Sequence, residues 1–249
     1  MIRSLKPALA LGVAGTLATL AVLPYLMVLQ AETFAEIPLP LPLLVLAQSV
    51  QSMLVFTVMA FLGLRAAASV GLKVPLIRGW LRDAEKSEVP VKTLLLSLLG
   101  GFVLALGVAA IDPLFGLPVP DVAKPAIWKG ALASLYGSIG EEVQLRLFLM
   151  SVLAWGLSKL GGKRADGTTK AWPIAAAMVL AALLFGLGHL PTAFAIWEPS
   201  VLVVARTVLL NAALGLPFGW LYWKYGLEHA IVAHFGADIA LHVVVAGFS

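Results

Sequence analysis

Six ionisable side chains lie within long apolar segments and are spaced so that they can share one site. They are Glu141, Glu142, Arg146, His189, His234 and Asp238. Carboxylate and imidazole groups serve as general bases in hydrolysis, bind metals, and relay protons across membranes. A charge at the centre of a bilayer costs about 2.5–3.5 kcal/mol on insertion scales, so such groups are usually functional. We therefore expect one polar site inside a membrane protein.

The two adjacent glutamates have different expected partners. Glu142 and Arg146 are four positions apart, so on an α-helix they meet on one face, as a structural ion pair or as a brace for a site. Glu141 points about 100° away from Glu142 at 3.6 residues per turn. A carboxylate without a salt-bridge partner in a low-dielectric site suits general-base chemistry. Glu141 is therefore the stronger catalytic candidate.

His189 ends the next apolar segment, in the stretch Phe185-Gly-Leu-Gly-His189. Alone, such a histidine is more often packed or interfacial than catalytic. Gly186 and Gly188 weaken the helix here and permit another backbone to approach closely. His189 should therefore lie near the outer end of its span, shallower than Glu141.

The last apolar segment carries His234 and Asp238, four positions apart and therefore on one helix face. His242 continues this stripe one turn later, whereas His229 is expected near the membrane interface without a role. A carboxylate often only sets the tautomer of a nearby histidine. This pair is therefore informative only together with the other segments.

Composition indicates the elements that must position these groups. Of 249 residues, 61% are hydrophobic and 12% are charged, against about a quarter charged in soluble domains. Apolar runs of about 20 residues match the hydrocarbon thickness, and the alternating pattern of a transmembrane barrel is absent. We predict an all-α, polytopic helical bundle forming a single domain over residues 1–249. The absence of cysteine excludes disulfides, thiolate nucleophiles and cysteine–metal sites.

About seven spans are predicted, with an interfacial amphipathic helix between the second and the third. The first apolar run is too long for a signal peptide and should be a retained span. The segment 73–88 mixes charged and apolar residues, as interfacial helices do. The spans are placed at 8–30, 41–64, 92–111, 131–157, 172–190, 200–222 and 226–247.

Basic residues predict the orientation of the bundle. With a cytoplasmic N-terminus, 13 lysines and arginines fall in cytoplasmic loops and only Lys124 and Lys129 fall outside. This excess accounts for the net charge of +4 without nucleic-acid binding. In a bacterium the membrane would be the cytoplasmic (inner) one.

The order of the three motifs carries a family resemblance over about residues 131–242. Glu-Glu-x-x-x-Arg at 141–146, Phe-x-x-x-His at 185–189 and His-x-x-x-Asp at 234–238 each lie on a separate hydrophobic segment. This order resembles the CPBP (Abi) family of intramembrane proteases, which includes CAAX prenyl endopeptidases and bacteriocin-processing enzymes. The resemblance implies a glutamate-dependent endopeptidase acting on a membrane-associated peptide or lipidated protein.

The resemblance also implies a role for each residue. Glu141 and His189 would activate a water, His234 and Asp238 would occupy the oxyanion-stabilising positions, and Glu142 with Arg146 would brace the site. The prenyl endopeptidases carry asparagine where this chain has Asp238. An ionised aspartate can only accept hydrogen bonds, so Asp238 is protonated, orients His234 or ligates a metal. We favour orientation of His234.

Other interpretations remain open. Glu141, His189 and His234 form a His2Glu set that could bind zinc, although no His-Glu-x-x-His motif is present and we favour a cofactor-free mechanism. The same groups would suit a proton- or ion-coupled transporter or a non-catalytic immunity or scaffold protein. Arg206 should snorkel at the outer end of its span or bind a substrate carboxylate. The sequence does not indicate an oligomeric state.

Overall fold

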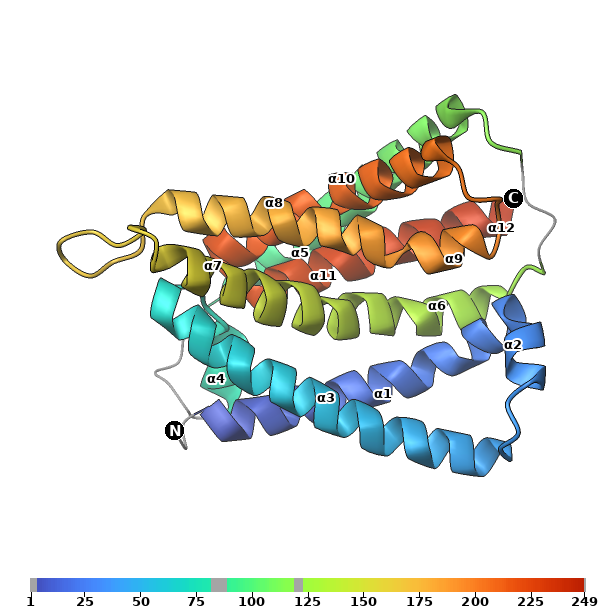
Figure 1. Cartoon of the computed structure of the whole chain (residues 1–249), viewed down its shortest axis with the longest axis horizontal. Helices are drawn as coiled ribbons and strands as arrows, with labels where there is room; N and C mark the ends of the chain where they lie inside the picture. Colours follow the sequence, from blue (N-terminus) through green and yellow to red (C-terminus); the bar gives the residue numbers. More distant parts are fainter. Residues whose placement is uncertain (1–3, 82–88, 119–122, 249) are drawn as a thin grey trace.

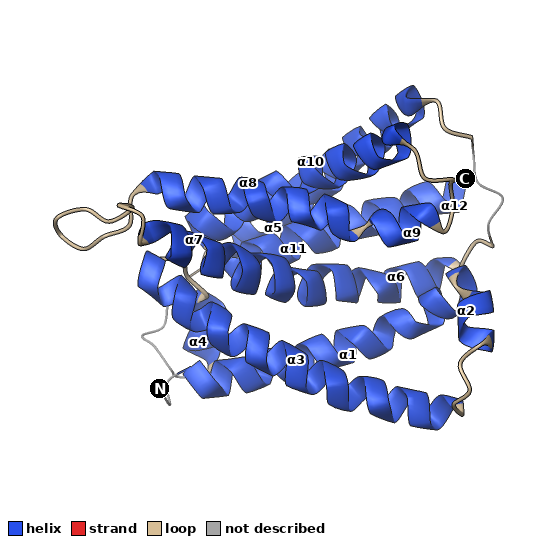
Figure 2. Cartoon of the chain, viewed as in Figure 1, coloured by secondary structure: helices blue, strands red, loops and turns tan. Residues whose placement is uncertain are grey.

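Long helices run side by side along one axis and form a single bundle (Figure 1). The computed structural model describes residues 4–81, 89–118 and 123–248. Within these ranges every regular element is a helix, and the connections are loops (Figure 2). The predicted all-α membrane bundle is therefore confirmed.

Six helical segments are long and apolar enough to cross a membrane. A seventh, continuous helix formed by α6, η3 and α7 also runs the length of the bundle (Figure 1) but carries Lys129, Glu141, Glu142 and Arg146. The chain termini lie at opposite ends of the bundle, as an odd number of crossings requires (Figure 1). The elements are α1 (Leu5–Leu29), α2 (Ala31–Ala35), α3 (Leu41–Val70), α4 (Pro75–Trp80), α5 (Val91–Ile111), the 3₁₀ turn η2 (Asp112–Phe115), α6 (Ile127–Leu135), η3 (Tyr136–Met150), α7 (Ser151–Ser158), α8 (Ala171–Gly188), α9 (Leu190–Phe194), α10 (Val201–Tyr225), α11 (Leu227–Ile239), η4 (Ala240–Val245) and α12 (Ala246–Phe248).

Glycines set the closest helix crossings. A methyl group on Gly101 of α5 would overlap the Ala233 carbonyl of α11, and one on Gly186 of α8 would lie 2.7 Å from Val208 Cα of α10. Small residues permit this approach because apolar burial alone does not bring helices together in lipid. The α5–α11 and α8–α10 pairs thereby hold two of the motif-bearing helices in place.

The fifth span ends later than predicted. It extends through α9 to Phe194, because His189 keeps a right-handed helical conformation and Pro191 begins a further helical turn. His189 therefore lies within the span rather than at its end, and the expected mismatch in depth with Glu141 disappears. The predicted interfacial helix at 73–88 is represented by α4, and its residues 82–88 lie outside the described ranges.

Candidate active site

The first motif lies on a π-helix. Residues 136–150 form η3, whose i→i+5 hydrogen bonds widen each turn relative to an α-helix. Such segments often occur at functional sites. Glu142 and Arg146 still meet, with Glu142 Oε1 2.9 Å from Arg146 Nη1, so the predicted ion pair is present.

This ion pair is fully buried. The Glu142 side chain is 0% exposed and that of Arg146 is 1% exposed. Arg146 Nη2 also donates to the Gly215 carbonyl of α10 at 3.0 Å, and the guanidinium lies 4.9 Å from the ring centre of Phe185. Arg146 thus joins η3 to α8 and α10 and supplies the positive charge that Glu142 needs in an apolar interior.

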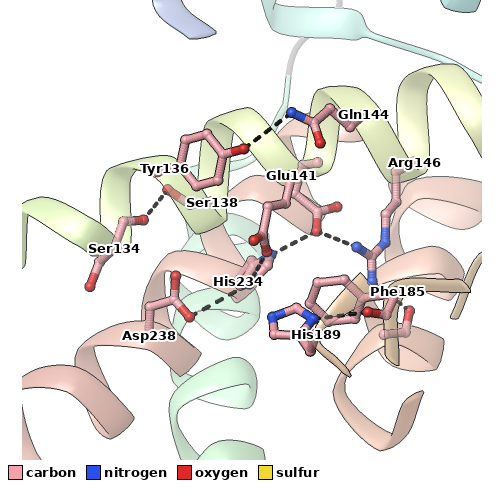
Figure 3. A network of polar contacts seen from close by, with 12 residues as sticks. Ser134, Tyr136, Ser138, Glu141, Gln144, Arg146, Phe185, His189, His234 and Asp238 are labelled. Atoms are coloured by element: carbon pink, nitrogen blue, oxygen red, sulfur yellow. Dashed lines mark hydrogen bonds and ion pairs between the residues drawn. The ribbon is translucent and has the colours of Figure 1, made fainter. Parts of the chain in front are cut away.

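His234 makes its shortest polar contact with Glu142. Its Nδ1 lies 2.8 Å from Glu142 Oε1, and because a carboxylate accepts, Nδ1 is the donor. Nε2 then faces Asp238 Oδ1 at 3.5 Å and Glu141 Oε2 at 3.8 Å (Figure 3). Glu142, already anchored by Arg146, therefore makes the shorter of the two contacts, and a role of Asp238 in orienting His234 stays a prediction.

The tautomer of His189 follows from one hydrogen bond. Nδ1 lies 2.8 Å from the Phe185 carbonyl oxygen, which can only accept. In the neutral ring Nδ1 therefore carries the hydrogen and Nε2 carries the lone pair. The Phe185 ring packs edge-on against His189 at 4.7 Å between ring centres, which restricts rotation of the imidazole.

A cavity of about 610 Å³ inside the bundle brings the three motifs together. Its walls include Glu141, His189, His234 and Asp238, whereas Glu142 and Arg146 lie behind the wall. Glu141 is 21% exposed and can reach the cavity, in contrast to its buried neighbour. The four predicted catalytic residues thus surround one space, and the two supporting residues contact its wall residues His234 and Phe185 from behind.

Several wall residues were missed by sequence reasoning. Tyr25 of α1 lies with its hydroxyl 3.3 Å from His242 Nδ1, and Asn211 of α10 also lines the cavity. An amide in an apolar span was a usable signal for Asn211. No sequence signal pointed to Tyr25, because the N-terminal spans carry no family motif. Tyr25 lies here because α1 packs against the motif-bearing helices.

Two other polar residues have partners that are distant in sequence. Arg206 pairs with Asp112, with Nε–Oδ1 and Nη2–Oδ2 distances of 2.5 and 2.6 Å, so its guanidinium already has a carboxylate partner within the protein. His229, expected near the membrane interface, lies close to the start of α11, is 3% exposed and contacts Thr93 of α5.

The residues of the zinc alternative all line the cavity: Glu141, His189 and His234. Among the residues that the structure describes, no group of three or more histidine, aspartate or glutamate side chains is arranged to hold a metal ion. Independence from metal stays a prediction, with zinc as its alternative.

Comparison with known families supports the interpretation of the motifs. Residues 123–240, just under half of the chain, match the model of the family described as type II CAAX prenyl endopeptidase Rce1-like. No curated protein and no solved structure matches the chain. The matched segment includes all six motif residues and the helices that bring them to the cavity, and its family supports a membrane protease in general. Residues 123–240 are therefore similar to the Rce1-like family, consistent with the CPBP resemblance of the three motifs.

Proposed function

We propose that the protein is an intramembrane endopeptidase that hydrolyses a peptide bond of a membrane-associated substrate. One observation carries the proposal: carboxylate and imidazole groups from η3, the junction of α8 and α9, and α11 line a single cavity within the bundle. Glu141 faces this cavity, whereas Glu142 is buried and contacts Arg146 and His234. A free carboxylate beside a neutral imidazole is suited to deprotonating water.

The attack would use Glu141 and His189. Water held between Glu141 and His189 Nε2 attacks the peptide carbonyl carbon, and its proton passes to Glu141. The C–N bond of the tetrahedral intermediate then breaks, and the proton moves from Glu141 to the leaving amine. The chemistry balances with water as the only co-reactant.

His234 would stabilise the developing oxyanion. Its Nδ1–H donates to the Glu142 carboxylate. When the ring is protonated, its second donor, Nε2–H, points toward the cavity. Asp238 Oδ1 lies 3.5 Å from Nε2 and would help to hold this donor in position. A donor aimed at the oxyanion typically contributes a factor of about 10²–10³ to the rate.

The cavity also indicates the substrate class. Apart from the motif residues, its walls are mainly apolar side chains of the first three helices and of α10. These include Leu23, Leu26, Leu29, Phe34, Leu44 and Leu214. An apolar lining with a few convergent polar groups suits an apolar or lipid-bearing peptide.

The test is peptide cleavage by the full chain reconstituted in phospholipid vesicles. Unmodified and prenylated C-terminal peptides are compared for the natural protein, Glu141→Gln and Glu198→Gln. Glu198 is exposed in a loop and provides a matched control for the same chemical change. Glu141→Gln should lower the cleavage rate by a factor of about 10²–10⁴ with an unchanged unfolding midpoint.

Two outcomes would reject the proposal. Cleavage at the natural rate by Glu141→Gln would remove its central residue. An absence of cleavage by any form, together with an ion flux that Glu141→Gln abolishes, would instead support a transporter.

A further inference from the structure

A second cavity, of about 430 Å³, lies between α5, α10 and α11 and is separate from the candidate active site. Its volume falls within the range of small-molecule sites, about 300–1,000 Å³. Most of its wall is apolar. The residues that define it include Leu96, Gly100, Leu104, Phe218, Trp220 and His229.

The cavity is polar at one end and apolar at the other. Thr93, Tyr225 and His229 lie where α5 begins, α10 ends and α11 begins, whereas Leu104 lies deeper in the bundle. Eleven residues separate Thr93 from Leu104, which is about 16 Å along a helix. The hydrocarbon core is about 30 Å thick, so the cavity reaches through one leaflet.

The outward side of the cavity is incompletely covered by protein. Leu96, Trp220 and Tyr225 are 56%, 43% and 47% exposed. Exposed Lys92 and Lys224 flank its polar end in sequence. Aromatic and basic residues together are typical of the interfacial region, and lysines there attract anionic headgroups.

His229 is held at the polar end of the cavity by a hydrogen bond. Thr93 Oγ1 donates to the Pro90 carbonyl at 2.8 Å and therefore accepts from His229 Nε2 at 3.0 Å. The remaining ring nitrogen, Nδ1, is buried and has no surface open to the cavity. The polar groups available to a headgroup are therefore those at the outer rim.

We propose that this cavity binds one acyl chain of an anionic phospholipid, such as phosphatidylglycerol. The chain lies along Leu96 and Leu104, and the headgroup lies near Lys92 and Lys224. Phe218 is one of the residues that line the cavity, and its buried ring stacks on His234 at 4.7 Å between ring centres. The bound chain therefore borders the candidate active site, although the lipid site itself does not depend on the peptidase proposal.

The test uses photo-labelling of the full chain in phosphatidylcholine vesicles that contain a little phosphatidylglycerol with an acyl-chain diazirine. Gly100 and Gly107 lie on the same helix, and a methyl group added at either meets no atom within 4 Å. Only Gly100 lines the cavity. Gly100→Phe should fill it and lower labelling of segments 92–104 and 217–225 about tenfold or more, whereas Gly107→Phe should leave that labelling unchanged.

A second variant tests the proposal independently of how well Gly100→Phe folds. Lys92→Glu combined with Lys224→Glu changes only exposed side chains and should abolish the preference for unlabelled phosphatidylglycerol over phosphatidylcholine as competitor. The proposal is overturned if labelling persists in Gly100→Phe, falls equally in both glycine variants, or keeps its headgroup preference after charge reversal. Displacement by a prenylated peptide but not by phosphatidylglycerol would likewise overturn it, by assigning the cavity to a substrate chain.

Discussion

Replacing Arg146 with methionine would leave the Glu142 carboxylate without its positive partner in the interior of the bundle. Both side chains are almost completely buried, and their closest atoms are 2.9 Å apart. For charge centres about 4 Å apart and an effective dielectric of about 20, the attraction is about 4 kcal/mol. Removing one member of a buried pair typically costs about 3–5 kcal/mol. We therefore expect Arg146→Met to lower the free energy of unfolding by about 3–5 kcal/mol.

Two comparisons isolate the charge effect. Glu142→Gln combined with Arg146→Met removes both charges while keeping an oxygen that accepts from His234, so it should recover part of the loss, with a coupling energy of about 2–3 kcal/mol. Arg164→Met, in an exposed loop, should change stability by about 0.5 kcal/mol or less. The assay is reversible denaturant unfolding in mixed micelles.

The same variants separate stability from catalysis. Glu142 orients His234, so the double variant should cleave peptide more slowly than the natural protein even at temperatures where both are folded. A loss below about 1 kcal/mol for Arg146→Met, with no recovery in the double variant, would refute the reasoning that this pair is a buried electrostatic brace.

Three further predictions concern the cavity, the surface pair and cofactors. A methyl group on Gly137 would overlap Asp238 Oδ2, whereas one on Gly156 meets nothing within 4 Å. Gly137→Ala should therefore lower the free energy of unfolding by about 1–3 kcal/mol and slow cleavage. Gly156→Ala should do neither when unfolding and activity are measured in parallel. Arg206→Met removes a partly exposed pair with Asp112, so it should cost about 1 kcal/mol or less and leave KM unchanged; a raised KM would restore the substrate-carboxylate interpretation. Cleavage should survive exhaustive chelation with no metal detected by elemental analysis, and loss of activity that zinc restores would contradict the metal-independent mechanism.

Features of the chain that depend on local spacing were predictable. Apolar runs of sufficient length gave the bundle, because an apolar helix is the structure that satisfies backbone groups in lipid. The four-residue spacing of Glu142 and Arg146 gave their ion pair, since neighbours along one helix face stay neighbours even on the wider π-helix. The boundary near His189 was wrong because Pro191 signals a helix end, yet it also fits the first turn of a following helix.

Contacts between helices were not predictable from a single sequence. In lipid, hydrophobicity does not distinguish a face that packs against protein from one that contacts acyl chains. The partners of His229 and Arg206, and the arrival of Tyr25 at the cavity, depend on that choice.

By itself the sequence determined that this protein crosses the membrane repeatedly and that three of its helices carry ionisable groups in the order of a protease family. Only the tertiary structure decided which of the adjacent glutamates faces the cavity, which carboxylate lies closest to His234, and that the N-terminal helices complete the wall. The physical reason is that burial of a charge is tolerated only where distant segments supply its partners. Those partners are set by close helix crossings at glycines such as Gly101 and Gly186.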